Sequence, residues 1–164
     1  MKKNKLRAQV AIAVGACQEK KATDISILQL GAQASGFTDY FVICSGANPR
    51  QVQAISDDVD QKLGSTGVNP KHIEGYTQAD WVLMDYVDFV VHVFSESARK
   101  FYDLERLWKS ASRLQAADLE KPERKPAEKK AAAKRPVRPR KARKSPSKSA
   151  ARGRGTTTRK RKSS

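Results

Sequence analysis

Cysteine and histidine side chains are the usual ligands of a structural zinc ion, and this chain has two of each. Cys17 and Cys44 lack Cys-x-x-Cys spacing, and each falls in an apolar pattern where a small buried thiol is expected. With only His72 and His92 besides, too few ligands converge for a structural metal. We therefore predict no metal site and no disulfide framework. We interpret His92 as a sheet histidine with satisfied hydrogen bonds rather than a catalytic base.

Carboxylates occur in two groups whose spacing could matter for cation binding. Asp57, Asp58 and Asp60 lie on one predicted helix and are most simply its solvated face. Asp85 and Asp88 are three residues apart across a predicted turn, so they are not an alternating pair on one strand face that could hold Mg²⁺. No lysine-bearing phosphate loop accompanies them. We therefore predict no catalysis and no cofactor.

The first 17 residues allow two interpretations, a signal segment or a helix. Lys2, Lys3 and Lys5, followed by Val14-Gly15-Ala16-Cys17, imitate a lipoprotein signal. The apolar core is very short, however, and apolar residues recur at the spacing of one helix face: Leu6, Val10, Ala13, Val14 and Cys17. We favour the helix. No apolar run approaches the ~18 residues that span a bilayer, so we expect a cytoplasmic protein.

Two strands and a capped helix are predicted next. Residues 24–30 alternate as a half-buried strand does, and residues 40–44 form the apolar run of a central strand. Asn48 is a good N-cap and Pro49 suits the first helical position. The helix should end at Gly64 and Gly67, and its buried stripe should be Val52, Ile55, Val59 and Leu63.

The following segment predicts three strands and a last helix. A short strand is expected at 72–74, and strands at 81–86 and 89–94 leave Val87 and Asp88 as a tight turn, although neither is an ideal turn residue. The last helix should begin near Ser95, with heptad-like apolar spacing at Phe101, Leu104, Trp108 and Ala111. This order of elements predicts a mixed sheet with helices packed on it.

The charge of the chain is divided unevenly between two regions. The formal net charge is +16, but residues 121–164 hold 19 Lys or Arg against two acids, whereas residues 1–120 hold 14 against 15. The second region has no aromatic residue, and Val137 is its only Val, Ile or Leu. Such a segment cannot bury enough apolar surface to offset the entropy of ordering it. We predict one folded domain at 1–120 and a disordered basic tail at 121–164.

Five stretches of the first region occur in one collinear order. They are Thr38–Gly46; Arg50-Gln51-Val52 with Ala54-Ile55; Glu74-Gly75 with Asp80–Tyr86; Val90–Phe94; and Arg99–Trp108. This succession resembles the ribosomal silencing factor (Iojap) family over residues 6–112. The resemblance does not extend to the tail. One departure is Val87, where the family usually has glycine in the Asp-Tyr-x-Asp turn.

The resemblance implies a non-enzymatic factor that docks on the large ribosomal subunit. There it would contact ribosomal protein fourteen of the large subunit, stop the small subunit from joining and lower translation when nutrients are short. The implied fold is α/β, a mixed five-stranded sheet with flanking helices, nucleotidyltransferase-like but catalytically inactive. Nucleotidyl transfer remains the enzymatic alternative, because Ser45-Gly46 follows a strand, but the spacing of Asp85 and Asp88 argues against it.

Candidate docking residues are the aromatic and charged side chains within these motifs. Protein interfaces concentrate Trp, Tyr and Arg at their buried centres, and acidic groups suit pairing with basic side chains of a ribosomal protein. We expect docking to be led by Glu74, Trp81, Asp85 and Tyr86. Further contacts are expected from Asp88, Arg99, Tyr102, Glu105 and Trp108. Phe101 and Leu104 are assigned to the core.

The tail also has competing interpretations. An idle extension is the simplest, but a net charge of +17 makes residues 121–164 a strong polyanion ligand with sequence-blind, salt-sensitive binding. A histone-like nucleic-acid compactor, with the tail as its functional part, is a further alternative. We expect ribosomal RNA to be bound by Lys129, Lys130, Lys134, Arg135, Arg138, Arg140, Lys141, Arg143, Lys144, Arg152, Arg154, Arg159, Lys160, Arg161 and Lys162. The protein is expected to be a monomer or a weak homodimer.

Overall fold

The computed structural model describes residues 2–31, 36 and 38–121. The chain divides into two units, Met1–Lys125 and Pro126–Ser164. The basic tail predicted at 121–164, with all the RNA-binding residues proposed for it, therefore lies outside the described residues except for Lys121. Its disorder and the domain boundary at residue 120 stay predictions.

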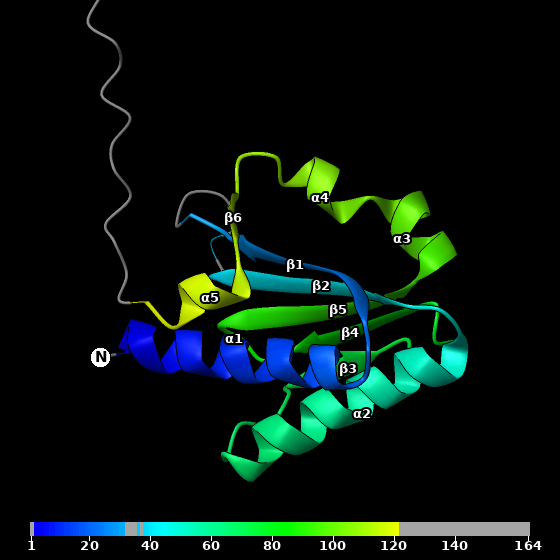
Figure 1. The fold of residues 1–164 in the computed structure, drawn as a ribbon, viewed down its shortest axis with the longest axis horizontal. Helices are drawn as coiled ribbons and strands as arrows, with labels where there is room; N and C mark the ends of the chain where they lie inside the picture. The colour runs from blue at the N-terminus through cyan, green and yellow to red at the C-terminus, as the bar shows by residue number, and fades with distance from the viewer. Residues whose placement is uncertain (1, 32–35, 37, 122–164) are drawn as a thin grey trace, which may run out of the picture. The chain divides into compact units, whose positions relative to one another are not determined.

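Helices and strands follow one another along the described residues in the order labelled in Figure 1. The helices are α1 (Lys2–Glu19), α2 (Pro49–Ser65), α3 (Glu96–Tyr102), α4 (Leu104–Leu107) and α5 (Ala116–Leu119). The strands are β1 (Thr23–Gln29), β2 (Tyr40–Gly46), β3 (His72–Glu74), β4 (Trp81–Asp85), β5 (Phe89–Ser95) and β6 (Ser112–Leu114). The predicted first helix and the five predicted strands are confirmed, with ends that shift by one or two residues.

The strands form one mixed sheet in the order β3-β4-β5-β2-β1-β6. β2 and β5 pair in parallel, Tyr40 opposite Phe89, and every other neighbouring pair is antiparallel. β2 is buried along its whole length, as its apolar run predicted for a central strand. The sheet has six strands rather than the expected five, because Ser112–Leu114 adds an edge strand beside β1 that is too short to leave an alternating pattern in the sequence.

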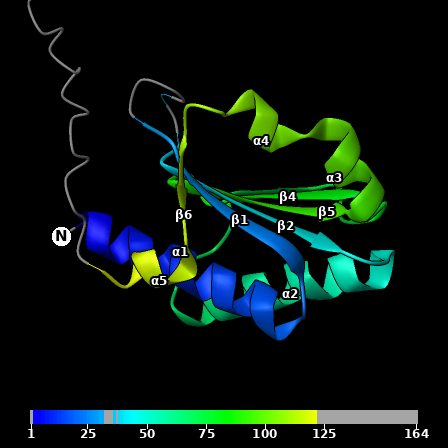
Figure 2. The same cartoon turned by 45° about the horizontal axis from the view of Figure 1, so that its top comes forward.

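Helices cover the two faces of the sheet unequally. Figures 1 and 2 show α1, α2 and α5 on one face, and α3 and α4 on the other. The first face holds the larger apolar cluster, built from α1, α2 and the inward side chains of the strands. The second holds a smaller cluster beneath α3 and α4. The second face is therefore the less completely covered, and it is where the candidate site lies.

Local signals that set α2 are confirmed. The Asn48 side chain accepts a hydrogen bond from the Gln51 backbone N–H at 2.9 Å, and Pro49 occupies the first turn. The stripe predicted for this helix is fully buried, at 0% exposure for Val52, Ile55, Val59 and Leu63. Gly67, at φ +79°, follows the helix in the left-handed conformation that glycine favours. α2 also makes the parallel pairing possible, because parallel strands need such a crossover connection.

The predicted last helix is interrupted, and one core assignment is wrong. Asp103 adopts a left-handed conformation (φ 43°) between α3 and α4, so the heptad-like spacing does not lie on one continuous face. Phe101 is consequently 81% exposed rather than buried. Leu104 packs against the smaller cluster, as expected. We use the term arm surface for the exposed large apolar side chains of α3 and α4, which are Phe101, Tyr102 and Leu107.

No helix among the described residues is long and apolar enough to cross a membrane. α1 is nevertheless well anchored, because its buried residues pack into the larger cluster. The predicted helix face is confirmed at Leu6, Val10, Ala13, Val14 and Cys17.

Replacing Ile55 by alanine should test how much the larger cluster contributes to stability. The side chain is completely buried on α2, so we expect Ile55→Ala to lower the free energy of unfolding by about 2–5 kcal/mol. Urea denaturation followed by circular dichroism measures this loss. Ile73→Ala is the matched control, because Ile73 is 41% exposed and should change stability far less. Equal losses for the two variants would contradict the assignment of the core.

Candidate functional site

An aromatic cluster joins strands β4 and β5 to α3. The Trp81 ring stacks on Phe94 (centroids 5.1 Å apart) and lies 4.7 Å from Tyr102. Its indole N–H donates to Nδ1 of His92 at 3.1 Å. Trp81 is half-buried and Tyr102 is 45% exposed. The cluster is therefore fixed from below by the sheet and presents ring surface to solvent.

Arg99 and Glu105, which are both predicted docking residues, bind each other within the domain. Their side chains form an ion pair with two hydrogen bonds, to both carboxylate oxygens. Arg99 also donates to the Ser45 hydroxyl at 3.0 Å and to the Asp24 backbone carbonyl at 2.8 Å. Burial would raise the pKa of Glu105, but the hydrogen bond and charge of Arg99 outweigh it and lower that pKa below its usual value. The pair holds α3 and α4 against β1 and β2.

The same arrangement bears on the enzymatic alternative. Ser45 is buried and accepts from Arg99, so its hydroxyl supports α3 rather than facing an open cleft. Asp85 accepts a hydrogen bond from the Val87 backbone N–H at 2.7 Å, which uses its Oδ1 within the turn. No group of three or more metal-ligating side chains converges anywhere in the described part of the chain.

The remaining predicted docking residues differ in how far they reach the surface. Tyr86 is only 6% exposed and stacks on Phe89 at 4.8 Å, and burial raises its pKa above the ordinary value. Glu74 and Asp88 are exposed, and Glu74 contacts His72 at 2.7 Å. Trp108 is half-buried, with its ring against Phe41. Tyr86 therefore belongs with the core, and the others line or border the surface.

Two residues of the arm surface, Phe101 and Leu107, were not predicted as contact residues from the sequence. Phe101 is 81% exposed and Leu107 is 73% exposed, while Phe101 and Tyr102 pack edge to face at 5.0 Å. Large apolar side chains gathered on a surface commonly mark an interaction site. The periodic spacing hid them, because it assigned Phe101 to a helix face that ends at Tyr102. A break at Asp103 was the signal that could have revealed them, since aspartate is one of the few non-glycine residues that tolerate a left-handed conformation.

A pocket of about 360 Å³ opens on the same face of the sheet, near the β4–β5 turn. We call it the sheet pocket. It is lined by Thr38, Phe41, Lys71, Leu83, Asp85, Val87, Val90 and His92. His92 is 5% exposed, and its Nε2 has no hydrogen-bond partner within the described ranges. The prediction of a fully satisfied sheet histidine is therefore wrong for this one nitrogen.

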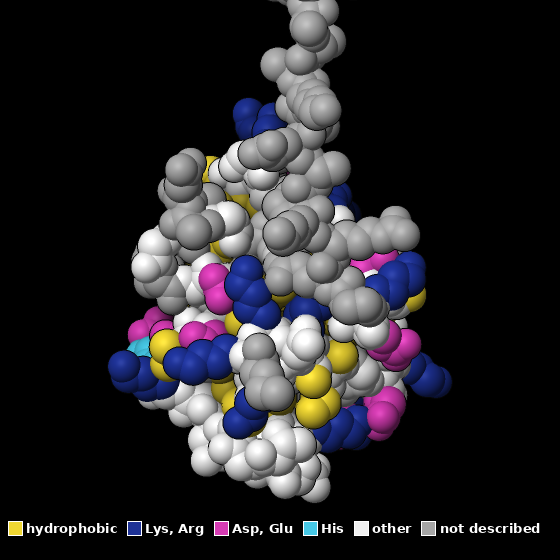
Figure 3. All heavy atoms as spheres, turned by 90° about the vertical axis from the view of Figure 1, so that its left-hand side faces the viewer, with side chains coloured by type: hydrophobic (Ala, Val, Ile, Leu, Met, Phe, Trp, Pro, Cys, Tyr) yellow, Lys and Arg dark blue, Asp and Glu magenta, His cyan; other side chains and the backbone are white. Residues whose placement is uncertain are grey.

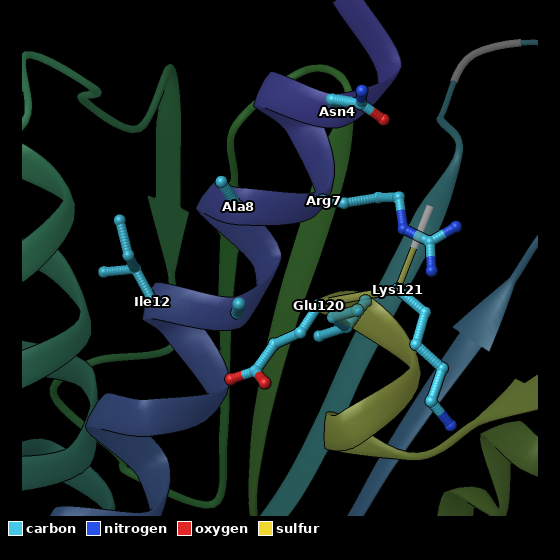
Figure 4. Close-up of a pocket in the computed structure, with 8 residues that line it drawn as sticks. Asn4, Arg7, Ala8, Ile12, Glu120 and Lys121 are labelled. Atoms are coloured by element: carbon cyan, nitrogen blue, oxygen red, sulfur yellow. The ribbon is translucent and has the colours of Figure 1, made fainter. Parts of the chain in front are cut away.

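A second pocket, of about 480 Å³, lies between α1 and α5 (Figure 4). Arg7 extends from α1 along this pocket and is 6% exposed. One of its terminal N–H groups donates to the Asp118 backbone carbonyl. Its main effect is to fasten the short helix α5 to α1, together with the buried Leu119.

The two cysteines are buried and unlinked, as expected. The Cys44 thiol faces that of Cys17 across the α1–β2 contact, with the sulfur atoms 3.6 Å apart. The hydrogen bond between the thiols, together with burial, raises the pKa of Cys44 well above its usual value. The Cys44 thiol is therefore not a ready nucleophile.

Comparison with known proteins places these features in a family. The family model described as "Ribosomal silencing factor during starvation" matches residues 3–145. The chain belongs to this family. The ribosomal silencing factor of Bacillus subtilis is 43% identical over 100 residues, which cover 61% of this chain and 84% of that protein. The chloroplast Iojap protein of Zea mays is 34% identical over 104 residues.

Solved structures of similar proteins support this membership. A crystal structure from Chromobacterium violaceum superposes with a TM-score of 0.60 at 33% identity, and covers 62% of this chain and 84% of that one. A second, from Bacillus halodurans, has a TM-score of 0.56 at 38% identity, and covers 65% of this chain and 95% of that one. The resemblance drawn from the five motifs is therefore confirmed for the family and for the mixed α/β fold.

His92 should stay neutral across the neutral and mildly acidic range. Burial lowers its pKa from 6.5 to about 4, and acceptance from Trp81 at Nδ1 places the ring proton on Nε2. In the unfolded chain the neutral ring takes up a second proton near pH 6.5, well above the pKa of the folded protein. The contribution of neutral His92 to the free energy of unfolding is therefore complete above about pH 6.5, and it falls by roughly 3 kcal/mol toward pH 4. Nitrogen-15 NMR of the histidine rings measures both the pKa and the tautomer. A His92 pKa near 6.5 would contradict this environment.

Proposed function

We propose that this protein binds the large ribosomal subunit through its folded domain and thereby represses translation without catalysis. The observation that carries the proposal is the arm surface beside the Trp81 cluster, in a chain that belongs to the ribosomal silencing factor family. A murine relative, 29% identical over 102 residues, is named for mitochondrial assembly of the ribosomal large subunit. Its name supports a large-subunit partner here as well.

The chemistry of this surface suits a protein partner. Aromatic side chains supply contact area at the buried centre of interfaces, and Trp81 and Tyr102 are held in place by their neighbours before any partner arrives. Phe101 and Leu107 would gain most from burial, because they are the most exposed large apolar residues among those described. Preorganised rings lose little conformational freedom on binding.

Acidic side chains lie on β3 and beside the β4–β5 turn. Glu74 lies on the edge strand β3, and Asp85 and Asp88 flank the β4–β5 turn. They would pair with basic groups of the partner and set its orientation. Ribosomal protein fourteen of the large subunit is the partner we propose. A factor seated there would keep the small subunit from joining and lower translation during nutrient limitation.

The set of proposed contact residues differs from that expected from the sequence. Arg99, Glu105 and Tyr86 leave it, because their side chains are occupied or buried within the domain. Phe101 and Leu107 enter it, because they are exposed. The set becomes Glu74, Trp81, Asp85, Asp88, Phe101, Tyr102, Leu107 and Trp108.

Contacts with ribosomal RNA are assigned to the tail. Figure 3 views the end of the domain that carries the start of α1, where Lys and Arg side chains are interspersed with acidic and apolar ones. The basic side chains of the described residues that are visible in this view form no continuous patch. Residues 121–164, with 19 Lys or Arg, are the polyanion-binding part of the chain that we propose.

Sedimentation through sucrose gradients with purified ribosomal subunits tests the proposed function. We expect the full chain to travel with large subunits and to reduce the amount of joined ribosomes when small subunits are added. Phe101→Ser should weaken binding at least tenfold without unfolding the domain, because its ring makes little contact within the fold. Lys109→Ser is the matched control, since Lys109 is exposed outside the proposed contact set. Equal association with both subunits would contradict the proposal.

Salt should separate the contributions of the domain and the tail. Log affinity for RNA falls by ~0.7–0.9 per neutralised phosphate for each tenfold rise in salt. The full chain should therefore bind large subunits more tightly than a chain ending at Lys125 at low salt, with the difference closing as salt rises. Binding constants at several salt concentrations measure the two slopes. Identical slopes would show that the tail does not contact RNA.

A further inference from the structure

Val87 occupies a backbone conformation that a β-branched residue rarely adopts. It is the middle residue of the three-residue loop between β4 and β5, and its φ is +75°. Its own N–H donates to Asp85, and the Asp88 N–H donates to the Tyr86 carbonyl at 3.0 Å, closing a three-residue turn. Glycine takes this conformation at no steric cost. Valine at this position is strained.

Packing inside the domain does not compensate for this strain. The Val87 side chain is 50% exposed and belongs to neither apolar cluster. The turn depends on backbone N–H groups and on the Asp85 carboxylate, all of which glycine would leave in place. Residues held in such conformations concentrate where they serve binding. The benefit of the isopropyl group should therefore arise outside the folded domain.

The position of Val87 indicates what that benefit is. Its side chain lines the sheet pocket, whose apolar walls include Phe41, Leu83 and Val90. His92 also lines this pocket, and its buried Nε2–H has no hydrogen-bond partner among the described residues. A buried donor gains when an acceptor reaches it. The complementary occupant is an apolar side chain next to an uncharged oxygen acceptor, such as a backbone carbonyl.

Other occupants match this pocket less well. Lys71 and Asp85 both line it, so their charges offset each other and offer little attraction to a phosphate. Residues 121–164 of the chain itself contain Val137 as their only Val, Ile or Leu. The pocket also lies on the sheet face that carries Trp81 and the arm surface, so one protein partner could cover both.

We propose that Val87 is a specificity-determining contact residue, and that the sheet pocket it borders receives an apolar side chain of the protein partner on the large ribosomal subunit. This inference rests on the proposed function and deepens it. The strained turn holds the isopropyl group at the rim, where the partner side chain covers it. Glycine in its place would relieve the strain and remove the contact.

The test compares thermal stability and large-subunit affinity in three full-length variants. Val87→Gly should raise the melting temperature by a few degrees and weaken binding about tenfold. Val87→Ala keeps a Cβ, so it should weaken binding with little gain in melting temperature. Lys21→Gly is the matched control, because Lys21 also has a positive φ (58°) but is exposed in the α1–β1 turn. It should raise the melting temperature and leave binding unchanged.

Each outcome separates this inference from the proposed function. If the unsubstituted chain does not bind large subunits, the proposed function fails. If that chain binds and Val87→Gly binds as tightly, the function stands and the contact is refuted. A lower melting temperature for Val87→Gly would refute the strain. If Val87→Gly instead disrupts self-association in analytical ultracentrifugation, the occupant is a second copy of this chain and the assignment to a ribosomal partner is overturned.

Discussion

The parallel pairing of β2 with β5 is the constraint on which the rest of this structure depends. Both strands are buried over nearly their whole length, and their register fixes where each neighbouring element begins. It brings Ser45 opposite Phe94, so that Arg99 on α3 reaches the Ser45 hydroxyl. At the other end of the pairing, Tyr40 lies opposite Phe89, and this register fixes where the β4–β5 turn lies relative to β2. The two ends of this one pairing therefore position both parts of the proposed binding face.

The two faces of the sheet consequently differ in how they are covered. One face is closed by two long helices and supplies most of the apolar burial. The other is covered only by the short helices α3 and α4, which the Arg99–Glu105 pair ties to the strands. Such a pair contributes little to stability in itself, but it fixes the orientation of the aromatic rings beside it. Rigid packing on one face of the sheet thus supports the proposed binding face on the other.

Most of this architecture could be predicted from the sequence, because buried positions recur at the regular spacing of a helix face or a strand. The stripe of α2, its Asn48 cap and the run in β2 were all legible, since each depends on local chemistry or on simple alternation. The break at Asp103 was not, because a single left-handed residue changes which face Phe101 occupies without changing the spacing of apolar residues. The internal contacts of Arg99 and Glu105 were not predicted from the sequence for a related reason. Their partners, Ser45 and Asp24, are more than 50 residues away in the chain, and charge alone does not reveal an internal partner.

The paired thiols of Cys17 and Cys44 make the contact between α1 and β2 a reporter of local opening. Both are fully buried, so a thiol-modifying reagent in solution can reach them only after α1 leaves the sheet. In the regime where closing outpaces modification, the labelling rate then gives the population of that open state, as amide exchange does for backbone groups. Both cysteines lie on the sheet face covered by α1 and α2. The labelling rate would therefore report detachment of α1 and would not respond to movements of α3 and α4.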